Sequence, residues 1–465
     1  MRELGWSTRN SYCAHVLLNE KRYKRRDAAL KQMMLLDGWK TFRLIRQALA
    51  SSRWRLEDLR QVQEERLRML LNHAYHNVPL YRGLYKEAGY HPEKFRSLDD
   101  IDKIPILQKD RLKQASPEEV VAQGIDPHGC GVFETSGSTG TPLRIFLGPI
   151  DQQWQRVVAW RILFEHGFRW TDRTLEIRMN FGRQFFVQRL GIAPKEWCSI
   201  LDPPECWAQR IVETRPDVIV AGAGTLHALA ETVQTLGLNL PRPRLIISDS
   251  ETLSPATRQL VWRALGTDPI DVYGLVELSN FAWECERRSG FHVSADSHIV
   301  EVAAASGDPG PIITTALGMW TMPMIRYETG DLAEVETTSC PCGRSLPLLR
   351  RIYGRRVDSV VLQDGRRIFW PFFHEVLGRY DELHQWRILQ DRLNEVQLQI
   401  VVTNNAQGLL SRIESDLQAV LPGEIHLRVE RVERIPISPG EKTRMIISKV
   451  GTAIEEQTVS GRQGL

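Results

Sequence analysis

The 465-residue sequence has no apolar run long enough to cross a lipid bilayer. Its longest apolar stretches, near residues 217–222 and 311–317, fall well short of the ~20 residues that a transmembrane helix needs. The N-terminus is mixed polar and lacks the apolar stretch of a secretory signal. We therefore expect a cytoplasmic protein without a membrane span.

Cysteine is also scarce, with 7 residues scattered along the chain. An odd, dispersed set fits free thiols or metal ligands in a reducing compartment better than a disulfide framework. The net charge of +3 is nearly neutral, so no overall field requires nucleic acid as a partner. The basic run Lys21–Arg26 leaves an anion-binding patch open, but we favour a solvated helical face.

The composition is that of an ordinary globular protein, with 42% hydrophobic and 25% charged residues. Its length suggests about two to four domains. The patterns change near residues 56 and 356. We predict an α/β fold with a basic helical extension over residues 1–55, a large unit with helix-covered sheets over 56–355, and a small α+β unit over 356–465.

Within the large unit, short β-branched runs alternate with helical patterns. Strands are predicted over 217–221, 244–248, 270–273, 299–302 and 312–315, and helices over 56–76, 154–167 and 254–265. Ser254 followed by Pro255 is a typical helix start. The small unit is predicted to contain strands over 357–362, 367–370, 396–402 and 425–432 and a helix over 408–420.

Two glycines and four hydroxyl side chains are concentrated in Thr135-Ser136-Gly137-Ser138-Thr139-Gly140. Glycine lets the backbone approach a ligand closely, and successive N–H groups then form an anion-binding concavity to which hydroxyls add donors. No Gly-Lys-Ser/Thr follows, so the segment is not a Walker loop. It indicates a phosphate-binding loop, with an ordinary flexible loop as the alternative.

Four more segments follow this loop in a specific order. They are Asp271–Glu277, Ile325–Leu332, Tyr353–Asp358 and Pro439–Arg444. Each by itself is explained as well by a surface turn that carries a solvated charge. Together with the loop, they resemble the adenylate-forming superfamily, and within it the phenylacetate–coenzyme A ligase and coenzyme F390 synthetase branch. The segments Leu70–Arg82 and Leu98–Lys109 resemble the same branch, so the resemblance extends over about residues 56–449.

The resemblance implies a large adenylation domain and a small, mobile C-terminal lid domain. It implies that residues 135–140 wrap the β- and γ-phosphates of ATP and that Lys442 on the lid is catalytic. It further implies contacts to adenine, ribose, α-phosphate and Mg²⁺ from Ser250, Glu251, Tyr273, Gly274, Glu277, Asp331 and Arg355, with Glu277 as the Mg²⁺ ligand. A carboxylate suits both Mg²⁺ and ribose hydroxyls.

A second set of residues has metal-ligand chemistry. Cys285, His292, Cys340 and Cys342 supply three thiols and one imidazole, which suit a tetrahedral structural Zn²⁺ site. The short Cys-Pro-Cys spacing leaves unrelated buried cysteines and a surface histidine as the alternative. Members of the phenylacetate–coenzyme A ligase branch carry a similar set, which favours zinc.

The predicted function is therefore a two-step ligase that uses ATP, Mg²⁺, a small-molecule carboxylic acid and coenzyme A. Phe181, Phe185 and Phe186 suggest an aryl or arylacetic acid, although they fit a plain core equally well. One alternative keeps the adenylation and changes the acceptor to an amine, a hydroxyl or a carrier-protein thiol. The other is a catalytically weakened relative that serves a biosynthetic assembly, because Glu441 separates Gly440 from Lys442 where the family has Gly-Lys.

Overall fold

The computed structural model describes residues 40–134, 143–179, 188, 190–303, 309–355, 358–380, 382–402, 408–435 and 444–450, without the side chains of Pro371 and His384. The predicted phosphate loop, the phenylalanines near residue 185, the basic run Lys21–Arg26 and Lys442 lie outside these residues. Among the described residues, no helix has the length and apolar character needed to cross a membrane.

The centre of the molecule is one 11-stranded sheet that confirms the predicted α/β class. Its strands, in spatial order, are β10 (His298–Val302), β11 (Gly310–Ala316), β12 (Tyr327–Glu336), β13 (Leu348–Arg355), β9 (Phe291–Val293), β8 (Ser279–Glu284), β7 (Ile270–Leu275), β6 (Leu245–Asp249), β5 (Val218–Gly222), β3 (Thr174–Arg178) and β4 (Lys195–Ser199). The strands from β4 to β7 run parallel, and those from β7 to β10 are antiparallel. The change from parallel to antiparallel therefore occurs at β7.

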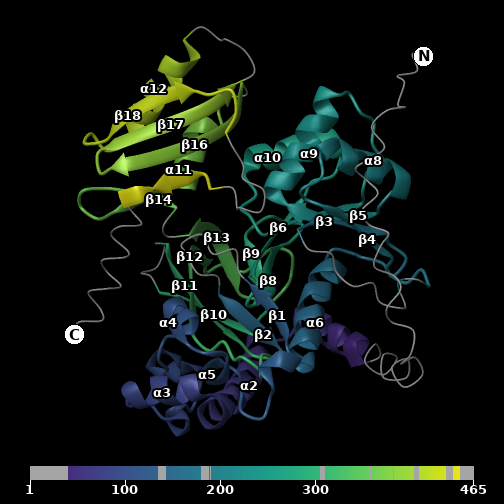
Figure 1. The fold of residues 1–465 in the computed structure, drawn as a ribbon, viewed down its shortest axis with the longest axis vertical. Helices are drawn as coiled ribbons and strands as arrows, with labels where there is room; N and C mark the ends of the chain where they lie inside the picture. The colour runs from purple at the N-terminus through teal and green to yellow at the C-terminus, as the bar shows by residue number, and fades with distance from the viewer. Residues whose placement is uncertain are drawn as a thin grey trace.

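Helices cover the parallel half, as its nearly continuous apolar strands require. They are α8 (Pro204–Thr214), α9 (Ala223–Thr235) and α10 (Pro255–Leu265), which Figure 1 shows together at upper right. All five residues of β6 are buried. The predicted cap of α10 is confirmed, because the Ser254 hydroxyl accepts a hydrogen bond from the Thr257 N–H.

The N-terminal helices pack against the antiparallel half, except that the first of them, over residues 40–51, packs against Val157 through Ile45 and Ala48. They are a helix over residues 40–51, α2 (Leu56–Asn77), α3 (Pro79–Glu87), α4 (Lys109–Gln114) and α5 (Pro117–Val120), with short 3₁₀ turns η2 (Pro92–Lys94), η3 (Leu98–Lys103) and η4 (Pro127–Gly129). Leu67, Leu70 and Leu71 on α2 are completely buried. The Tyr81 hydroxyl on α3 donates to the Pro323 carbonyl (2.9 Å) and accepts from the Ile325 N–H (2.8 Å), which ties this helix to the sheet.

The remaining elements are a hairpin and a helix beside the main sheet. β1 (Gly131–Glu134) and β2 (Arg144–Leu147) pair as a two-stranded sheet, and α6 (Pro149–Glu165) follows. The sequence pattern places the start of α6 at Trp154, which is five residues too late. Pro149 at the first helical position is the start signal that hydrophobic periodicity alone does not detect.

A second, four-stranded sheet with its own hydrophobic core is formed by the C-terminal residues. Its order is β18 (His426–Arg431), β17 (Glu395–Val402), β16 (Leu383–Arg392) and β19 (Ile446–Ser448). The hairpin β14 (Ser359–Val361) and β15 (Arg367–Phe369) and the helices α11 (Trp370–Leu377) and α12 (Leu409–Val420) complete this part of the chain. Figure 1 shows these elements at upper left, away from the helices α2 to α5.

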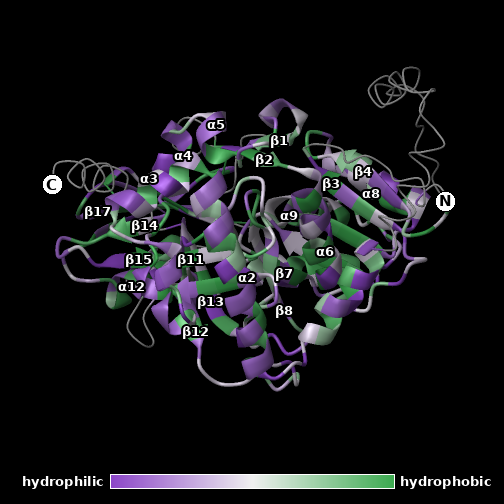
Figure 2. Cartoon of the chain, turned by 90° about the horizontal axis from the view of Figure 1, so that it is seen from below, coloured by the Kyte–Doolittle hydropathy of each residue, from purple (hydrophilic) through white to green (hydrophobic). Residues whose placement is uncertain are grey.

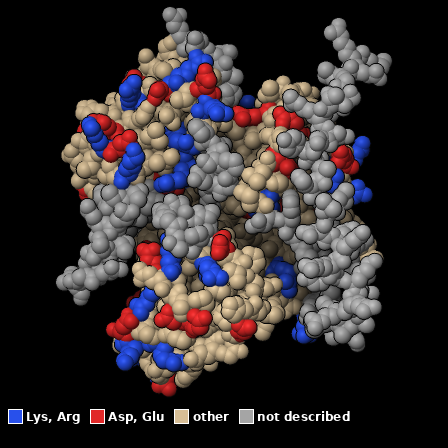
Figure 3. Space-filling model, in the orientation of Figure 1, with Lys and Arg blue, Asp and Glu red and all other residues tan. Residues whose placement is uncertain are grey.

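The surface carries the mixed character that the composition predicts. Figure 2 shows hydrophilic and hydrophobic residues alternating along outer helices such as α2. Figure 3 shows lysine and arginine interspersed with aspartate and glutamate on the face that it draws. This mixture agrees with a net charge of +3.

Candidate active site and metal cluster

The predicted nucleotide residues gather around the strand at which the main sheet changes from parallel to antiparallel. In open α/β sheets, ligands bind beyond the carboxyl ends of the parallel strands. Tyr273 and Gly274 lie on β7, and Glu277 lies in the turn to β8. A Cβ at Gly274 would collide with the backbone of Asn280, so this position requires glycine.

Tyr273 and Asp331 form the first contact of the candidate site. The Tyr273 hydroxyl donates to Asp331 Oδ2 over 2.8 Å, although the two residues are 58 positions apart. Burial and the neighbouring carboxylate raise the pKa of Tyr273 well above its ordinary value, so the phenol remains a donor. Asp331 is held in turn because its backbone N–H donates to the Thr329 hydroxyl over 3.1 Å.

Glu277 is a buried carboxylate with two partners from distant parts of the chain. Its Oε1 accepts from the Tyr327 hydroxyl (2.8 Å) and from the Lys109 ammonium (3.4 Å). The Glu277 side chain is 2% exposed, while that of Lys109 is 28% exposed. Lys109 therefore neutralises the carboxylate from one side and meets solvent on the other. No sequence pattern predicts a role for Lys109, because only the fold brings α4 to this turn.

Ser250 and Glu251 lie directly after β6, beside the end of β5. Glu251 Oε2 accepts a hydrogen bond from the Gly224 N–H over 2.7 Å, at the start of α9. Ser250 has a φ of +68°, a left-handed conformation that is rare for a residue with a side chain. The two residues thus belong to a tightly constrained turn at the same edge of the sheet as Tyr273.

Arg355 ends β13 and is the register partner of Asp331 on β12. Beyond it, Asp358 pairs with Arg444, whose Nε donates to Oδ1 over 2.6 Å. Burial raises the pKa of Asp358, and the Arg444 guanidinium opposes that rise. This ion pair ties the segment after β13 to the C-terminal strand β19.

A cleft of about 290 Å³ lies between the main sheet and the C-terminal sheet. Its lining includes Glu251, Arg355, Asp358 and Arg444. The structure therefore brings two of the predicted residues, Glu251 and Arg355, close to the segment that carries Arg444. Residues 135–140 and Lys442 lie outside the described residues.

The predicted metal ligands also lie close together in space. One ligand atom from each of Cys285, His292, Cys340 and Cys342 lies within 4.8 Å of every other. The Sγ atoms of Cys285 and Cys340 are 3.6 Å apart, and Cys342 Sγ is 3.3 Å from His292 Nε2. Two sulfurs bound tetrahedrally to one Zn²⁺ at ~2.3 Å would be about 3.8 Å apart, so the donor set fits zinc.

Burial shifts the pKa values of two residues of the cluster. Burial lowers the pKa of His292 to about 4, which keeps the imidazole neutral and able to act as a ligand. Burial raises the pKa of Cys285 to about 12 in the absence of a metal ion. The Arg344 guanidinium lies 5.2 Å from the ring centroid of Trp283 and pairs with Glu165 and Glu286, each at 3.0 Å.

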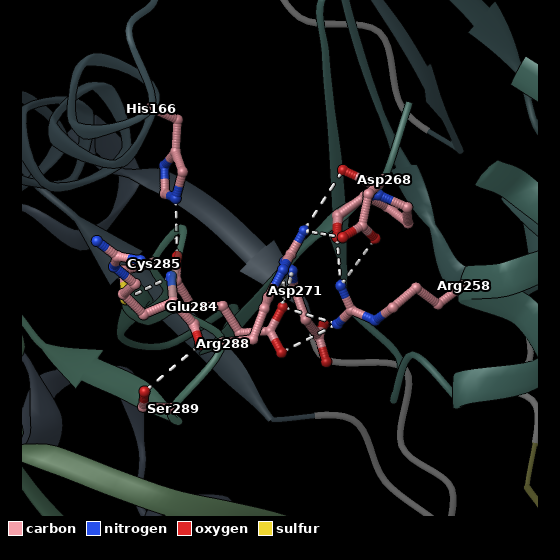
Figure 4. A network of polar contacts seen from close by, with 10 residues as sticks. His166, Arg258, Asp268, Asp271, Glu284, Cys285, Arg288 and Ser289 are labelled. Atoms are coloured by element: carbon pink, nitrogen blue, oxygen red, sulfur yellow. Dashed lines mark hydrogen bonds and ion pairs between the residues drawn. The ribbon is translucent and has the colours of Figure 1, made fainter. Parts of the chain in front are cut away.

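A network of charged residues connects the metal cluster to helix α10 and strand β7 (Figure 4). Glu284, which precedes Cys285, accepts hydrogen bonds from Arg258 (2.7 Å) and Arg288 (2.6 Å). The Asp271 N–H donates to Glu284 Oε2 over 3.0 Å. Burial, with Glu284 nearby, raises the pKa of Asp271 well above its ordinary value. The cluster is thus joined to the strand that carries Tyr273.

Comparisons with known proteins identify relatives of this chain. No family model matches the sequence. The chain is 30% identical over 409 residues to a phenylacetate–coenzyme A ligase of Thermus thermophilus, covering 81% of this chain and 89% of the relative. It is 30% identical over 363 residues to a phenylacetate–coenzyme A ligase of Aromatoleum evansii, covering 72% and 78%. A crystal structure of 2-hydroxyisobutyryl-CoA ligase with an acyl-AMP has a TM-score of 0.73 at 21% identity, covering 88% of this chain and 94% of that one.

Proposed function

Because the chain belongs to the phenylacetate–coenzyme A ligase family of adenylate-forming enzymes, we propose that it activates a carboxylic acid with ATP and transfers the acyl group to coenzyme A. In the first step, a carboxylate oxygen attacks the α-phosphorus of ATP, and pyrophosphate leaves from the acyl-adenylate. In the second step, the coenzyme A thiol attacks the acyl carbon, loses its proton, and AMP leaves. The observation that carries the proposal is the identity of 30% over 89% of the Thermus relative.

The residues around β7 are proposed to bind the nucleoside. A carboxylate accepts hydrogen bonds from the two ribose hydroxyls, and Asp331 is already oriented by Tyr273 and by Thr329. Tyr273 and Gly274 would lie against the adenine, together with the turn at Ser250 and Glu251. Arg355 stands opposite Asp331 in the register and would contact the ribose or the α-phosphate.

Glu277 is the proposed ligand of Mg²⁺, which prefers carboxylate oxygen. When bound, Mg²⁺ supplies positive charge that offsets the charge of the phosphates. Lys109 would act at the same place, since its ammonium lies 3.4 Å from Glu277 Oε1 and is partly open to solvent. We propose that Lys109 holds the buried carboxylate in position and adds a cation to the phosphate site.

Lys442 is proposed to act in the first step, on a C-terminal lid formed by residues 356–465. A positioned ammonium offsets the charge that develops as pyrophosphate leaves, an effect typically worth ~3–4 kcal/mol per donor. Lys442 lies two residues before Arg444 in the sequence, and Arg444 pairs with Asp358 at the cleft. Rotation of the lid about Asp358 would withdraw Lys442 before the second step.

We further propose that Cys285, His292, Cys340 and Cys342 hold a structural zinc ion. Four protein ligands close the coordination shell, so the ion would stabilise the fold rather than take part in the reaction. None of the six described cysteines forms a disulfide, which supports the expectation of a reducing compartment such as the cytoplasm.

Acid-dependent exchange of labelled pyrophosphate into ATP tests the proposal directly. A panel of aryl, arylacetic, hydroxylated and short-chain acids should contain members that support exchange, and those acids should release AMP in proportion to added coenzyme A. If exchange occurs but AMP release does not depend on coenzyme A, the acceptor of the acyl group would be an amine, a hydroxyl or a carrier protein instead. No exchange with any acid would contradict the proposed function.

A further inference from the structure

The carboxyl ends of β3 and β6 carry a charged pair that the roles above do not use. Arg178, the last residue of β3, donates to both carboxylate oxygens of Asp249, the last residue of β6, over 2.7 Å and 2.6 Å. The Asp249 side chain is 3% exposed, whereas that of Arg178 is 29% exposed. The Asp249 carboxylate is therefore buried beneath the Arg178 guanidinium, and one edge of that guanidinium stays exposed to solvent.

Further hydrogen bonds to Asp249 hold the pair in a fixed position. Its oxygens also accept hydrogen bonds from the Ser250 hydroxyl (3.1 Å) and from the Asn280 side-chain amide (3.3 Å). A third donation from Arg178 reaches the Ser250 hydroxyl at 3.4 Å. An arginine has five N–H donors, so among the described contacts two remain for an acceptor on the exposed edge.

The location of the pair places it beside the proposed nucleotide contacts. β6 is the neighbour of β7, which carries Tyr273 and Gly274. Asn280 is the register partner of Gly274 on β8, and the same Asn280 contacts Asp249. The pair thus lies at the sheet edge where an α/β fold binds its ligands, on the parallel side of the nucleotide residues. An acyl group joined to the α-phosphate has to occupy a place next to those residues.

We propose that Arg178 and Asp249 select the acyl group, and that the acid activated here carries a neutral hydroxyl or carbonyl oxygen in addition to its reacting carboxylate. This inference rests on the proposed function and narrows its substrate class. A hydrocarbon acyl group would remove water from the guanidinium edge without replacing its hydrogen bonds, and sites of this kind discriminate strongly against such an analogue. A second carboxylate fits less well, because Asp249 already neutralises the arginine.

Matched acids that differ by one oxygen test the inference in the unmodified protein. The pairs are phenylacetate with 4-hydroxyphenylacetate, benzoate with 3-hydroxybenzoate, and isobutyrate with 2-hydroxyisobutyrate, and a dicarboxylic acid is the charged comparison. In pyrophosphate exchange, kcat/KM should be at least about tenfold higher for the hydroxylated member of one pair or more. Equal or better use of the hydrocarbon member in every active pair would overturn the inference and leave the proposed function intact. No exchange with any acid would overturn both.

A double variant then tests whether the preference for the hydroxylated acid depends on Arg178 and Asp249. Arg178→Met with Asp249→Asn removes both charges, so no unpaired buried charge remains. The ratio of kcat/KM within the preferred pair should fall to within about twofold, mainly through a higher KM for the hydroxylated acid, with thermal melting reporting the fold. A double variant that folds and keeps the original ratio would overturn the inference.

The chain offers a matched control on the same strand. Lys195 and Glu176 form an ion pair of 2.7 Å between β4 and β3. Lys195→Met with Glu176→Gln removes a neighbouring ion pair without touching the carboxyl ends of the strands. This control should retain the preference of the unmodified protein, and loss of the preference in both double variants would contradict a specific role for Arg178 and Asp249.

Discussion

Burial decides the protonation of individual side chains in this protein, and His298 is the clearest case. The residue is completely buried, stacks on Phe281 with ring centroids 4.6 Å apart, and places Nε2 at 3.1 Å from the Leu278 carbonyl. Burial lowers the pKa of His298 to about 3. The folded protein thus keeps this imidazole neutral at a pH where an unfolded chain would protonate it.

The stability of the protein should therefore fall on acidification through this histidine. Because its pKa is lower in the folded state, the unfolded state binds the extra proton, and stability is lost as the pH falls from ~6.5 toward 3. One such histidine contributes a slope of up to about 1.4 kcal/mol per pH unit. His298→Gln should show a shallower loss of unfolding free energy between pH 6.5 and 4.5 in denaturant titrations.

An exposed histidine supplies the control for this experiment. His426 is exposed on β18, and His426→Gln should keep the pH dependence of the unmodified protein. An unchanged slope in His298→Gln would show that His298 is not the group that titrates.

The roles of single residues could be predicted where those residues belong to a short sequence motif. Tyr273 and Asp331 lie on strands and Glu277 follows one, each within a recognisable motif, and in the fold the Tyr273 hydroxyl contacts Asp331. Lys109 and Arg444 were missed as partners of Glu277 and Asp358, which lie 168 and 86 positions away. Ion pairs between such distant positions leave no spacing signal in the sequence.

At the scale of elements, buried parallel strands were the easiest to predict. The predicted strands over 217–221 and 244–248 correspond to Val218–Gly222 and Leu245–Asp249, because all-apolar runs between turns are distinctive. β16 was missed, since its polar residues alternate with few apolar ones. β19 and α11 were also not predicted. β19 has only three residues and depends on parallel pairing with β16, and α11 follows β15 without a turn that would mark its start.

The stability of the turns that hold the metal cluster should depend on a bound ion. Cys285 follows β8, His292 lies on β9, and Cys340 and Cys342 lie between β12 and β13, so the ion would join elements of the antiparallel half. The purified protein should contain about one equivalent of zinc. Its removal by a strong chelator should lower the melting temperature by at least ~5 °C, and Cys340→Ser should do the same.

Another cysteine distinguishes metal binding from a general effect of thiol loss. Cys206 on α8 forms no disulfide and lies outside the cluster. Cys206→Ser should leave zinc content and melting temperature unchanged. Protein that contains no zinc and melts identically with and without chelator would contradict the proposed metal site.

At the scale of the whole molecule, a cleft lies between the two sheets, and the proposed reaction would take place beside it. Residues of the main sheet, such as Glu251 and Arg355, face it together with Arg444 from the C-terminal part. The Asp358–Arg444 pair is the described contact that ties the C-terminal strand to the proposed hinge. Composition and motif order predicted two units of this kind, but the arrangement across the cleft depends on contacts that no local pattern encodes.

The separation of the two half-reactions in Lys442→Ala tests the central claim most directly. Pyrophosphate exchange should fall by about 100-fold to 1000-fold, while coenzyme A-dependent release of AMP from a supplied acyl-adenylate should stay within about twofold. Lys449, which is exposed and pairs with Asp391 at 3.0 Å, gives the control Lys449→Ala, and both half-reactions should survive in it. Equal loss of both half-reactions in Lys442→Ala, or undiminished pyrophosphate exchange, would contradict the proposed role of the lid in acid activation.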